Sequence, residues 1–330
     1  MNVKRIGLLL TIFITGSLVT GCGTVNQKVN QNNEYTNQKS PQESNVKIME
    51  VTSNQIKQKW LNVSYANASP SEKLDIYLPN KGDGPYPVIL NIHGGAFRAG
   101  KKEEELSNLY EALNRGYAVV TMNYRLSEEA HFPAQINDVK AAIRFLRANA
   151  STYQLDPTKI AAWGSSAGGY LAALAGTSSG NKEFEGADLG NENQPSNVQA
   201  VVDWFGPINF LTMDDQFKQS GIKGLAHNKA NSPESQLFGE TITKIPDQVK
   251  EANPETYITQ DDPPFFIQHG TADNIVPVQQ STEFAAQLEK AMGNGKVTLE
   301  VLKGKKHMDP AFRTPANINK VLDFLDKTLK

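Results

Sequence analysis

Short apolar runs alternate with amphipathic segments through most of this 330-residue chain, and this alternation constrains the fold more than any other feature. Residues 88–92 and 118–122 are apolar at almost every position, as in strands buried on both faces of a sheet. Residues 103–115 and 133–149 carry apolar side chains at helical spacing. Strand followed by helix predicts an α/β fold with a mostly parallel central sheet and helices on both faces. The remaining elements that we expect are strands at 58–65, 74–78, 160–163, 200–205, 265–268 and 297–302, and helices at 167–175, 281–292 and 316–329.

One interval, residues 207–264, breaks this alternation because it is far longer than a normal crossover between two core strands. It is polar and in parts helix-prone, and Pro233, Pro246 and Pro254 divide it. We expect a helical cap, inserted into a catalytic domain that covers residues 46–330, which lies over the strand ends and shapes the substrate pocket.

The N-terminus has the pattern of an export signal. Lys4 and Arg5 precede an apolar stretch, residues 6–15, which is too short for a typical membrane span. Small residues then lead to Cys22, the single cysteine of the chain. Residues 18–22 resemble the lipobox of bacterial lipoproteins.

That resemblance implies that residues 1–22 end in a cleavage before Cys22 and that a lipid on the Cys22 sulfur anchors the protein at the extracytoplasmic face of the bacterial cell membrane. The alternatives are an ordinary secretory signal with an incidental cysteine, or an uncleaved anchor helix. Residues 23–45 are rich in Asn, Gln, Lys, Ser and Thr, which predicts a flexible tether.

The charge balance argues against one class of partner. The formal net charge is −2 and the chain has no basic block. Because nucleic-acid binding needs clustered Lys and Arg on one face, we expect no nucleic-acid partner.

A candidate nucleophile lies in Gly164-Ser165-Ser166-Ala167-Gly168, which fits the pattern G-x-S-x-G. The pattern alone is weak, but here it directly follows a predicted strand and opens a predicted helix. In that context the middle residue, Ser166, occupies a strained turn that exposes its hydroxyl, and the flanking glycines avoid clashes. We expect the neighbouring Ser165 to point elsewhere.

Glycines also follow the strand at 88–92, in His93-Gly94-Gly95-Ala96. Backbone N–H groups in such a loop can stabilise an oxyanion, because glycine lets the backbone approach a substrate without a Cβ. We assign the oxyanion donors to Gly94, Gly95 and Ala167. We expect His93 to brace the loop rather than act as a base, and the alternative is a plain glycine-rich turn.

A serine nucleophile needs a base and a carboxylate that orients the base. In this type of site the chain order is Ser, then Asp or Glu, then His. His307 lies in a loop before the last helix, and Asp273 lies just past the strand at 265–268, so these two residues fit as a pair. Asp203 and Asp309 are the weaker candidates for the acid. Of the other histidines after Ser166, we expect His269 to support a strand end and His227 to lie at the surface of the cap or to line its pocket.

Five ordered motifs, spread over residues 63–329, resemble hormone-sensitive-lipase-like esterases of the α/β-hydrolase fold, and within them the bifunctional feruloyl and acetyl-xylan esterase-like group. The resemblance implies hydrolysis of short acyl esters by a Ser-His-Asp acyl-enzyme mechanism, without a metal or other cofactor. It also implies that Tyr124-Arg125-Leu126 forms a structural loop near the pocket. The match departs from the H-G-G-G form of the oxyanion motif at Ala96. The motifs are His93-Gly94-Gly95-Ala96-Phe97, Asn123-Tyr124-Arg125-Leu126-Ser127, Phe132-Pro133-Ala134-Gln135, Gly164-Ser165-Ser166-Ala167-Gly168-Gly169 and His269-Gly270-Thr271-Ala272-Asp273.

The leading interpretation is therefore a serine carboxylesterase for small or carbohydrate-borne esters, including O-acetyl and feruloyl esters. Alternatives are an amidase or peptidase that uses the same triad, or a non-enzymatic surface binding protein on the same scaffold. A lipase is disfavoured, because the interval 207–264 has no broad apolar segment to serve as an interfacial lid.

Overall fold

An eight-stranded sheet forms the centre of the computed structural model, which describes residues 53–330 without the side chains of residues 53, 105–108 and 187. The predicted signal peptide with its lipidation site at Cys22 and the predicted tether, residues 23–45, lie outside the described residues. The strands are β1 (Lys59–Ser64), β2 (Lys73–Tyr77), β3 (Tyr86–Ile92), β4 (Ala118–Met122), β5 (Leu155–Ser165), β6 (Ala200–Trp204), β7 (Phe265–Gly270) and β8 (Val297–Leu302).

The strands lie in the order β1-β2-β4-β3-β5-β6-β7-β8. β2 pairs antiparallel with β1 and β4, and each later pairing in the sheet is parallel. Strand β5 begins at Leu155 rather than at residue 160, because Leu155 pairs with Tyr86 ahead of an irregularity in the register. The polar, partly exposed residues 156–159 hid this extension from the hydrophobic pattern.

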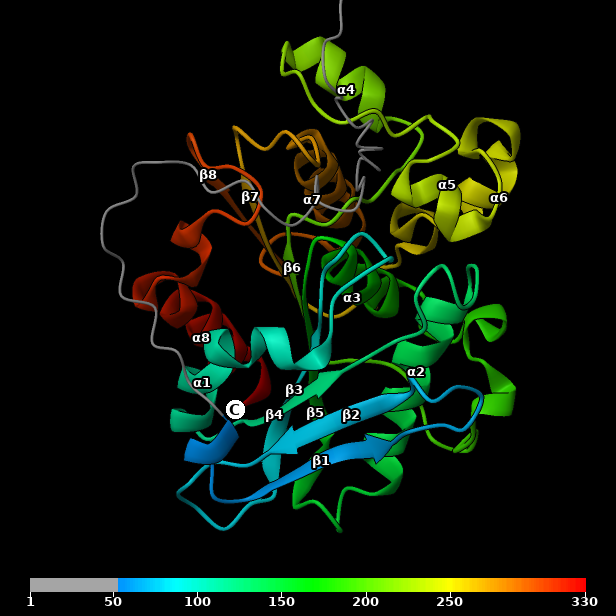
Figure 1. Cartoon of the computed structure of the whole chain (residues 1–330). Coiled ribbons are helices and arrows are strands. Elements are labelled where there is room, and N and C mark those ends of the chain that lie inside the picture. Colours follow the sequence, from blue (N-terminus) through cyan, green and yellow to red (C-terminus); the bar gives the residue numbers. More distant parts are fainter. Residues whose placement is uncertain (1–52) are drawn as a thin grey trace, which may run out of the picture. The chain divides into compact units, whose positions relative to one another are not determined.

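Helices cover both faces of the sheet, as Figure 1 shows with α1 and α8 on one side and α2 and α3 on the other. The helices are α1 (Leu106–Asn114), α2 (Ala134–Ala148), α3 (Ala167–Thr177), α4 (Met213–Ser220), α5 (Pro233–Phe238), α6 (Pro246–Glu251), α7 (Gln279–Met292) and α8 (Pro315–Leu329). No helix among residues 53–330 combines the length and apolarity that a membrane crossing requires.

Successive side chains of a strand enter two different hydrophobic cores. On β3, Val88 and Leu90 join the core that contains α2, α3 and α7, whereas Ile89 joins the core beneath α1 and α8. All three side chains are fully buried. Burial on both faces explains why these strands are apolar at almost every position. The predicted fold class, a mostly parallel sheet between two layers of helices, is confirmed.

Helices α4, α5 and α6 belong to the interval 207–264 that we predicted as a cap. This interval contacts three loops, and each loop follows the carboxyl end of a parallel strand. Gln236 accepts a hydrogen bond from Arg98 after β3, Leu237 O accepts one from the Phe132 N–H after β4, and the Leu225 N–H donates to Asn274 O after β7. The insertion therefore lies against the edge of the sheet where Ser166 follows β5.

Candidate active site

Ser166 occupies a sharp turn between β5 and α3. Its backbone has φ 54° and ψ −122°, a conformation that costs a non-glycine residue roughly 1–3 kcal/mol. A Cβ on Gly164 would lie 2.1 Å from Gly168 O, and one on Gly168 would lie 2.0 Å from Ile92 O. The two glycines of the motif are therefore required for the close approach of helix and strands, and the turn that they allow holds Ser166 in its strained conformation.

The structure brings Ser166, His307 and Asp273 together from three distant parts of the chain. His307 Nε2 lies 3.0 Å from Ser166 Oγ, and His307 Nδ1 lies 2.6 Å from Asp273 Oδ2. With its proton on Nδ1, His307 donates to Asp273 and leaves Nε2 free to accept the serine proton. This is the arrangement of a nucleophile, a base and an orienting carboxylate.

Asp273 is held as a carboxylate by its surroundings. Its Oδ1 accepts hydrogen bonds from the Ile275 and Val276 N–H groups, at 2.8 and 2.9 Å. Burial alone would raise the pKa of this carboxyl group, but His307 and His269 outweigh burial and hold the pKa of Asp273 well below its usual range. The 2.6 Å contact therefore joins the His307 ring to an ionised carboxylate.

His269 is a second histidine on the same carboxylate, which sequence reasoning did not anticipate. Its Nε2 lies 3.2 Å from Asp273 Oδ2 and 2.9 Å from Val276 O, and its Nδ1 lies 2.7 Å from Ser281 Oγ. We had expected only support of a strand end. The available signal was the spacing of four residues between His269 and Asp273, which spans the turn after β7.

The alternative candidates for the acid lie elsewhere. Asp203 is buried on β6 and accepts from the Gly206 N–H at 2.9 Å. Asp309 accepts from the Ala311 N–H at 2.9 Å. Neither carboxylate contacts His307 within the described residues.

His227 does not lie at the surface of the insertion, which was one of our two expectations for it, since only 2% of it is exposed. Its Nε2 lies 2.9 Å from Ile275 O, on the loop that carries Asp273, and its Nδ1 lies 3.0 Å from Glu234 Oε1. The reason is that the insertion folds back onto the loop after β7, a long-range contact that leaves no local pattern in the sequence.

His93 lies beside the glycine loop and does not contact Ser166. Its ring stacks on Tyr124 with centroids 4.4 Å apart, and its Nδ1 lies 2.7 Å from Gly94 O. Burial lowers the pKa of His93 to about 4, so the ring is neutral at pH 7. These contacts suit a side chain that holds the loop in place.

The predicted oxyanion donors lie next to Ser166, but Gly95 is needed for a reason that we had not predicted. Gly95 has φ +112°, and a Cβ there would lie 2.1 Å from Ala99 O, so it closes a turn within its own loop. The next residue, Ala96, adopts φ 55° despite its side chain. Among residues 53–330, the N–H groups of Gly94, Gly95 and Ala167 have no hydrogen-bond acceptor, which leaves them available to an oxyanion.

Phe205 is a further residue of the site that sequence reasoning missed. It follows β6, its backbone has φ 46°, and its ring packs edge-on against His307 with centroids 4.6 Å apart. The Phe205 N–H donates to Gln268 O at 2.8 Å, which fixes the Phe205 ring beside His307. The apolar run at 200–205 indicated only a buried strand.

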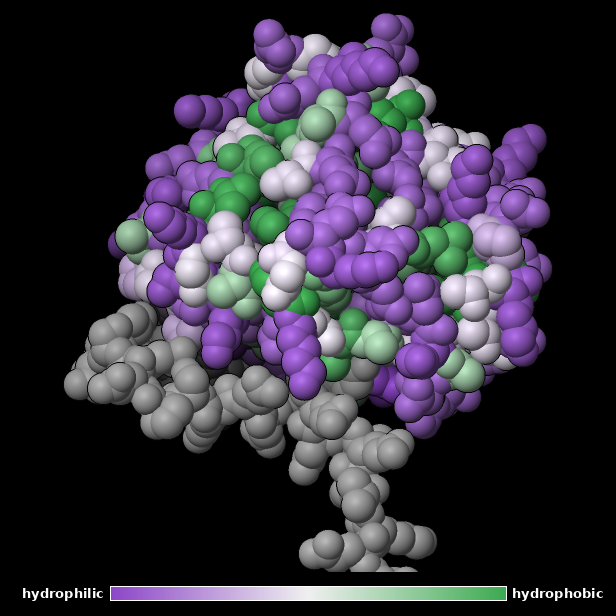
Figure 2. Space-filling view, turned by 90° about the horizontal axis from the view of Figure 1, so that it is seen from above, coloured by the Kyte–Doolittle hydropathy of each residue, from purple (hydrophilic) through white to green (hydrophobic). Residues whose placement is uncertain are grey.

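Figure 2 shows the face seen from above in Figure 1, on which apolar residues are broken up by hydrophilic ones rather than joined into one broad surface. Within the described part of the chain, no group of three or more His, Cys, Asp or Glu side chains is placed to hold a metal ion.

Comparison with known proteins identifies the family. The family model BD-FAE matches residues 74–288, which include Ser166 and Asp273. The chain belongs to the BD-FAE family. Among curated proteins, this BD-FAE chain is 33% identical over 231 residues to "Probable carboxylic ester hydrolase LipM" of Mycobacterium tuberculosis, covering 69% of the chain and 51% of LipM. It is 29% identical over 243 residues to "Esterase LipC" of the same organism, covering 72% of the chain and 57% of LipC. The chain thus spans about half the length of these relatives.

Two solved structures are also similar to the BD-FAE chain. "Truncated form of carbohydrate esterase from gut microbiota" shares 35% identity at a TM-score of 0.76 and covers 84% of the chain and 98% of that structure. "Bifunctional GH43-CE Bacteroides eggerthii" shares 36% identity at a TM-score of 0.73 and covers 82% of the chain and 35% of that structure. These structures confirm the α/β-hydrolase fold that the motifs implied.

Proposed function

We propose that this chain is a serine carboxylesterase that hydrolyses short-chain acyl esters, including O-acetyl or feruloyl esters on carbohydrate. The observation that carries the proposal is the continuous contact from Ser166 Oγ through the His307 ring to Asp273, at 3.0 and 2.6 Å. The relatives whose names denote ester hydrolases and carbohydrate esterases support the same reaction class.

In the acylation step, Ser166 Oγ attacks the ester carbonyl carbon while its proton moves to His307 Nε2. Negative charge then develops on the carbonyl oxygen, where the N–H groups of Gly94, Gly95 and Ala167 donate to it. Collapse of this intermediate breaks the bond to the alcohol oxygen, which takes the proton from His307. Asp273 stays ionised throughout, because its pKa is held low.

In the deacylation step, water enters beside His307 and loses a proton to Nε2 as its oxygen attacks the acyl carbon. The proton returns to Ser166 Oγ as the carboxylic acid leaves. The same residues serve both steps, and neither step calls on another group for proton transfer.

A lipid on Cys22 would place this enzyme at the outer surface of a bacterial cell membrane, where large external esters are accessible. The position of the single cysteine after Leu18-Val19-Thr20-Gly21 supports this part of the proposal. Intact-mass measurement of protein extracted from membranes checks it, and an unmodified Met1 start would contradict it.

The deciding experiment compares wild type with Ser166→Ala on p-nitrophenyl esters of increasing acyl length, with matched amides alongside. We expect wild type to prefer acetate or butyrate, and kcat in the variant to fall by roughly 10⁴- to 10⁶-fold, since removal of a triad serine has effects of that order. Circular dichroism of both proteins controls for folding.

Cleavage of amides in preference to esters would favour the amidase alternative. If the protein cleaves none of these substrates and is not labelled by a fluorophosphonate, the binding-protein alternative on the same scaffold is favoured.

A further inference from the structure

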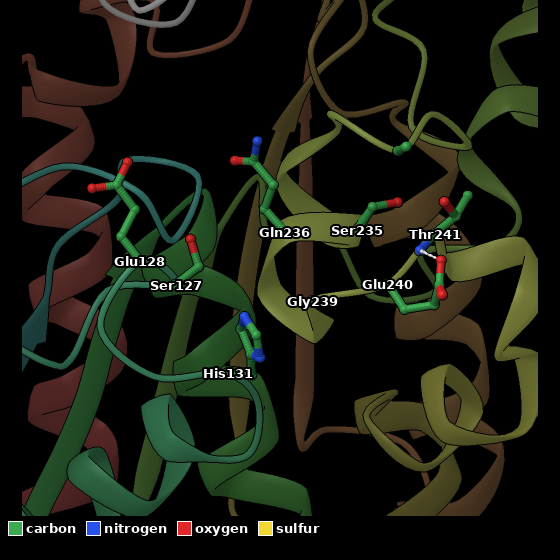
Figure 3. Close-up of a pocket in the computed structure, with 9 residues that line it drawn as sticks. Ser127, Glu128, His131, Ser235, Gln236, Gly239, Glu240 and Thr241 are labelled. Atoms are coloured by element: carbon green, nitrogen blue, oxygen red, sulfur yellow. Dashed lines mark hydrogen bonds between the residues drawn. The ribbon is translucent and has the colours of Figure 1, made fainter.

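A polar cavity of about 330 Å³ lies between the loop after β4 and the insertion (Figure 3). Ser127, Glu128 and His131 line it from the loop, whereas Gln236 and Glu240 line it from α5 and the residues that follow. The complete lining consists of Ser127, Glu128, His131, Ala230, Ser235, Gln236, Gly239, Glu240 and Thr241. The cavity does not include Ser166, and none of the steps described above uses it.

The loop side of this cavity is rigidly held. The Arg125 side chain pairs with Asp138 of α2 at 2.6 Å, and the Gln135 side chain donates to the carbonyls of Arg125 and Ala130 at 3.0 and 2.6 Å. These contacts fix both ends of the segment that carries Ser127 and Glu128. The cavity is therefore formed before any ligand arrives, which reduces the entropy that binding costs.

The insertion closes the other side through direct contacts with the same loop. The Phe132 N–H donates to Leu237 O at 2.8 Å. Gly239 packs so closely on His131 that a Cβ there would lie 2.3 Å from the imidazole ring. The two walls thus keep a fixed spacing.

Ser127 supplies the observation that points to a ligand. It is only 5% exposed, and its Oγ has no hydrogen-bond partner among the described residues. A buried hydroxyl without a partner costs about 1–3 kcal/mol, so its presence needs an explanation. The loop is held at this position by the backbone, because the Ser127 N–H donates to Phe97 O at 2.8 Å. The hydroxyl makes no bond to a described residue that would help to hold the loop.

Two further polar groups of the lining are also available. Gln236 Oε1 accepts from Arg98 at 2.8 Å, but Gln236 Nε2 donates to no described residue. The Glu128 carboxylate is exposed and pairs with no described residue. The cavity therefore offers a hydroxyl, an amide donor and a carboxylate acceptor, and its only ring is the His131 imidazole.

The cavity adjoins the oxyanion loop. A Cβ on Gly94 would lie 3.4 Å from Ser166 Cβ, and the Phe97 Cα is at most about 11 Å further along the chain from Gly94. The Phe97 ring packs on Tyr170 in the first turn of α3, with centroids 5.4 Å apart. The backbone N–H of Ser127 donates to the Phe97 carbonyl. A substrate whose ester lies at Ser166 reaches the cavity only if its alcohol part extends well beyond the cleaved bond.

We propose that this cavity is a subsite for an uncharged, hydroxyl-rich part of the alcohol moiety, a sugar unit remote from the acylated one. Each sugar hydroxyl both donates and accepts a hydrogen bond, which matches the donors Ser127 and Gln236 and the acceptor Glu128. The unpaired Glu128 carboxylate repels acidic sugars. The inference rests on the proposed esterase function and makes the enzyme selective for acylated oligosaccharides over acylated monosaccharides.

The test compares kcat/KM for two substrates. One is O-acetylated xylotriose, a neutral trisaccharide, and the other is O-acetylated xylose, the monosaccharide. We expect wild type to prefer the trisaccharide, and Ser127→Ala and Glu128→Gln each to reduce that preference by about three- to tenfold, the effect of one hydrogen bond. Glu192→Gln, at an exposed carboxylate outside the cavity and without a partner among the described residues, is the matched control and keeps the wild-type preference.

Thermal unfolding separates a ligand role of Ser127 from a structural one. Because its hydroxyl has no partner, Ser127→Ala should keep or raise the Tm, whereas a structural hydroxyl would lower it. Glu128→Gln, at an exposed position, keeps the kinetic test available even if the Ser127 variant folds poorly.

Failure of this inference is distinguishable from failure of the esterase proposal. Hydrolysis of p-nitrophenyl acetate without any preference for the trisaccharide would overturn the subsite alone, as would a Ser127→Ala variant with the wild-type preference. If no ester is cleaved, calorimetric titration with unmodified xylotriose decides. Binding that Ser127→Ala weakens supports the subsite, and the absence of binding overturns it.

Discussion

Asp203 shows how a single carboxyl group can oppose folding in this molecule. Its Oδ1 accepts from the Gly206 N–H at 2.9 Å, but its Oδ2 is buried without a partner among the described residues. Burial raises the pKa of Asp203 to about 6, although Gly206 and His269 act in the opposite direction. At pH 7 the group is therefore ionised at a cost to stability.

The sign of the resulting pH dependence follows from proton linkage. Between the ordinary pKa of 3.8 and the folded-state pKa of about 6, the folded chain binds more protons at this site than the unfolded chain. This group therefore lowers the free energy of unfolding as the pH rises through that range, by about 3 kcal/mol at most. We expect Asp203→Asn, which retains the Oδ1 acceptor, to lack this loss. Urea unfolding of both proteins at several pH values measures it.

The informative quantity is the stability difference between Asp203→Asn and wild type, because groups that titrate in both proteins cancel. This difference should move in favour of the variant from pH 4.5 to pH 7.5. A difference that stays constant across that range would contradict a raised pKa at Asp203.

Among the structural elements, the insertion is tied through His227 to the loop that carries Asp273. Burial alone would lower the pKa of His227, but the nearby carboxylates of Glu234 and Asp214 outweigh burial and leave the pKa raised above 6.5. Nδ1 lies 3.0 Å from Glu234 Oε1 and Nε2 lies 2.9 Å from Ile275 O, so a positive charge on the ring is favoured by the adjacent carboxylate. Phe217 covers one face of the ring, with centroids 6.0 Å apart.

We expect His227, like Asp203, to lower the free energy of unfolding as the pH rises. The cause differs, because carboxylates near His227 favour its charged form, whereas burial disfavours the charged form of Asp203. Because the folded-state pKa is raised, the stabilisation is fully present below about pH 6.5 and is lost as the pH rises through the folded-state pKa. His227→Gln keeps a donor for Ile275 O but removes the charge, so its unfolding free energy should lack this decline. Urea midpoints at pH 5.5 and pH 8.5 measure it.

Glu234→Gln provides a second variant for the same prediction. Without that carboxylate, burial dominates and the pKa of His227 moves down, so the decline should shrink or reverse. Parallel pH profiles for wild type and both variants would contradict a raised pKa at His227.

These elements also show what the sequence can predict. Repeated apolar spacing predicted the strands and most helices, because that spacing is local. The turn at Ser166 was recognisable for the same reason, since Gly164 and Gly168 are needed within the same short segment. The pairing of Asp273 with His307 required only the order of residues along the chain and their places at strand ends.

The rest of the site depends on which loops meet at one edge of the sheet, and no local pattern encodes that. His227, His269 and Phe205 are all within contact of Asp273, of its loop or of His307, but they come from a long insertion and from two strand ends. Ser127 was visible only as part of a motif, and the sequence could not show that its hydroxyl is buried without a partner among the described residues.

At the scale of the whole molecule, the sheet separates two hydrophobic cores that share strands but not side chains. Leu171 on α3 belongs to the core with α2 and α7, whereas Leu322 on α8 belongs to the core beneath α1, and both side chains are fully buried. Because alternate residues of the central strands enter opposite cores, a cavity on one face leaves the packing on the other face unchanged.

This separation predicts additive effects of substitutions on the two faces. Leu171→Ala and Leu322→Ala should each lower the free energy of unfolding by about 2–5 kcal/mol. The double variant should show their sum to within about 0.5 kcal/mol, as for distant sites without shared partners. The matched comparison is the double variant Leu171→Ala with Leu174→Ala, because these residues share one core and one helix. Its effects on the free energy of unfolding should not be additive.

Urea unfolding of all variants measures these free energies. A coupling across the sheet as large as the coupling within one core would show that the strands transmit packing changes between the faces, so that the two cores act as a single unit.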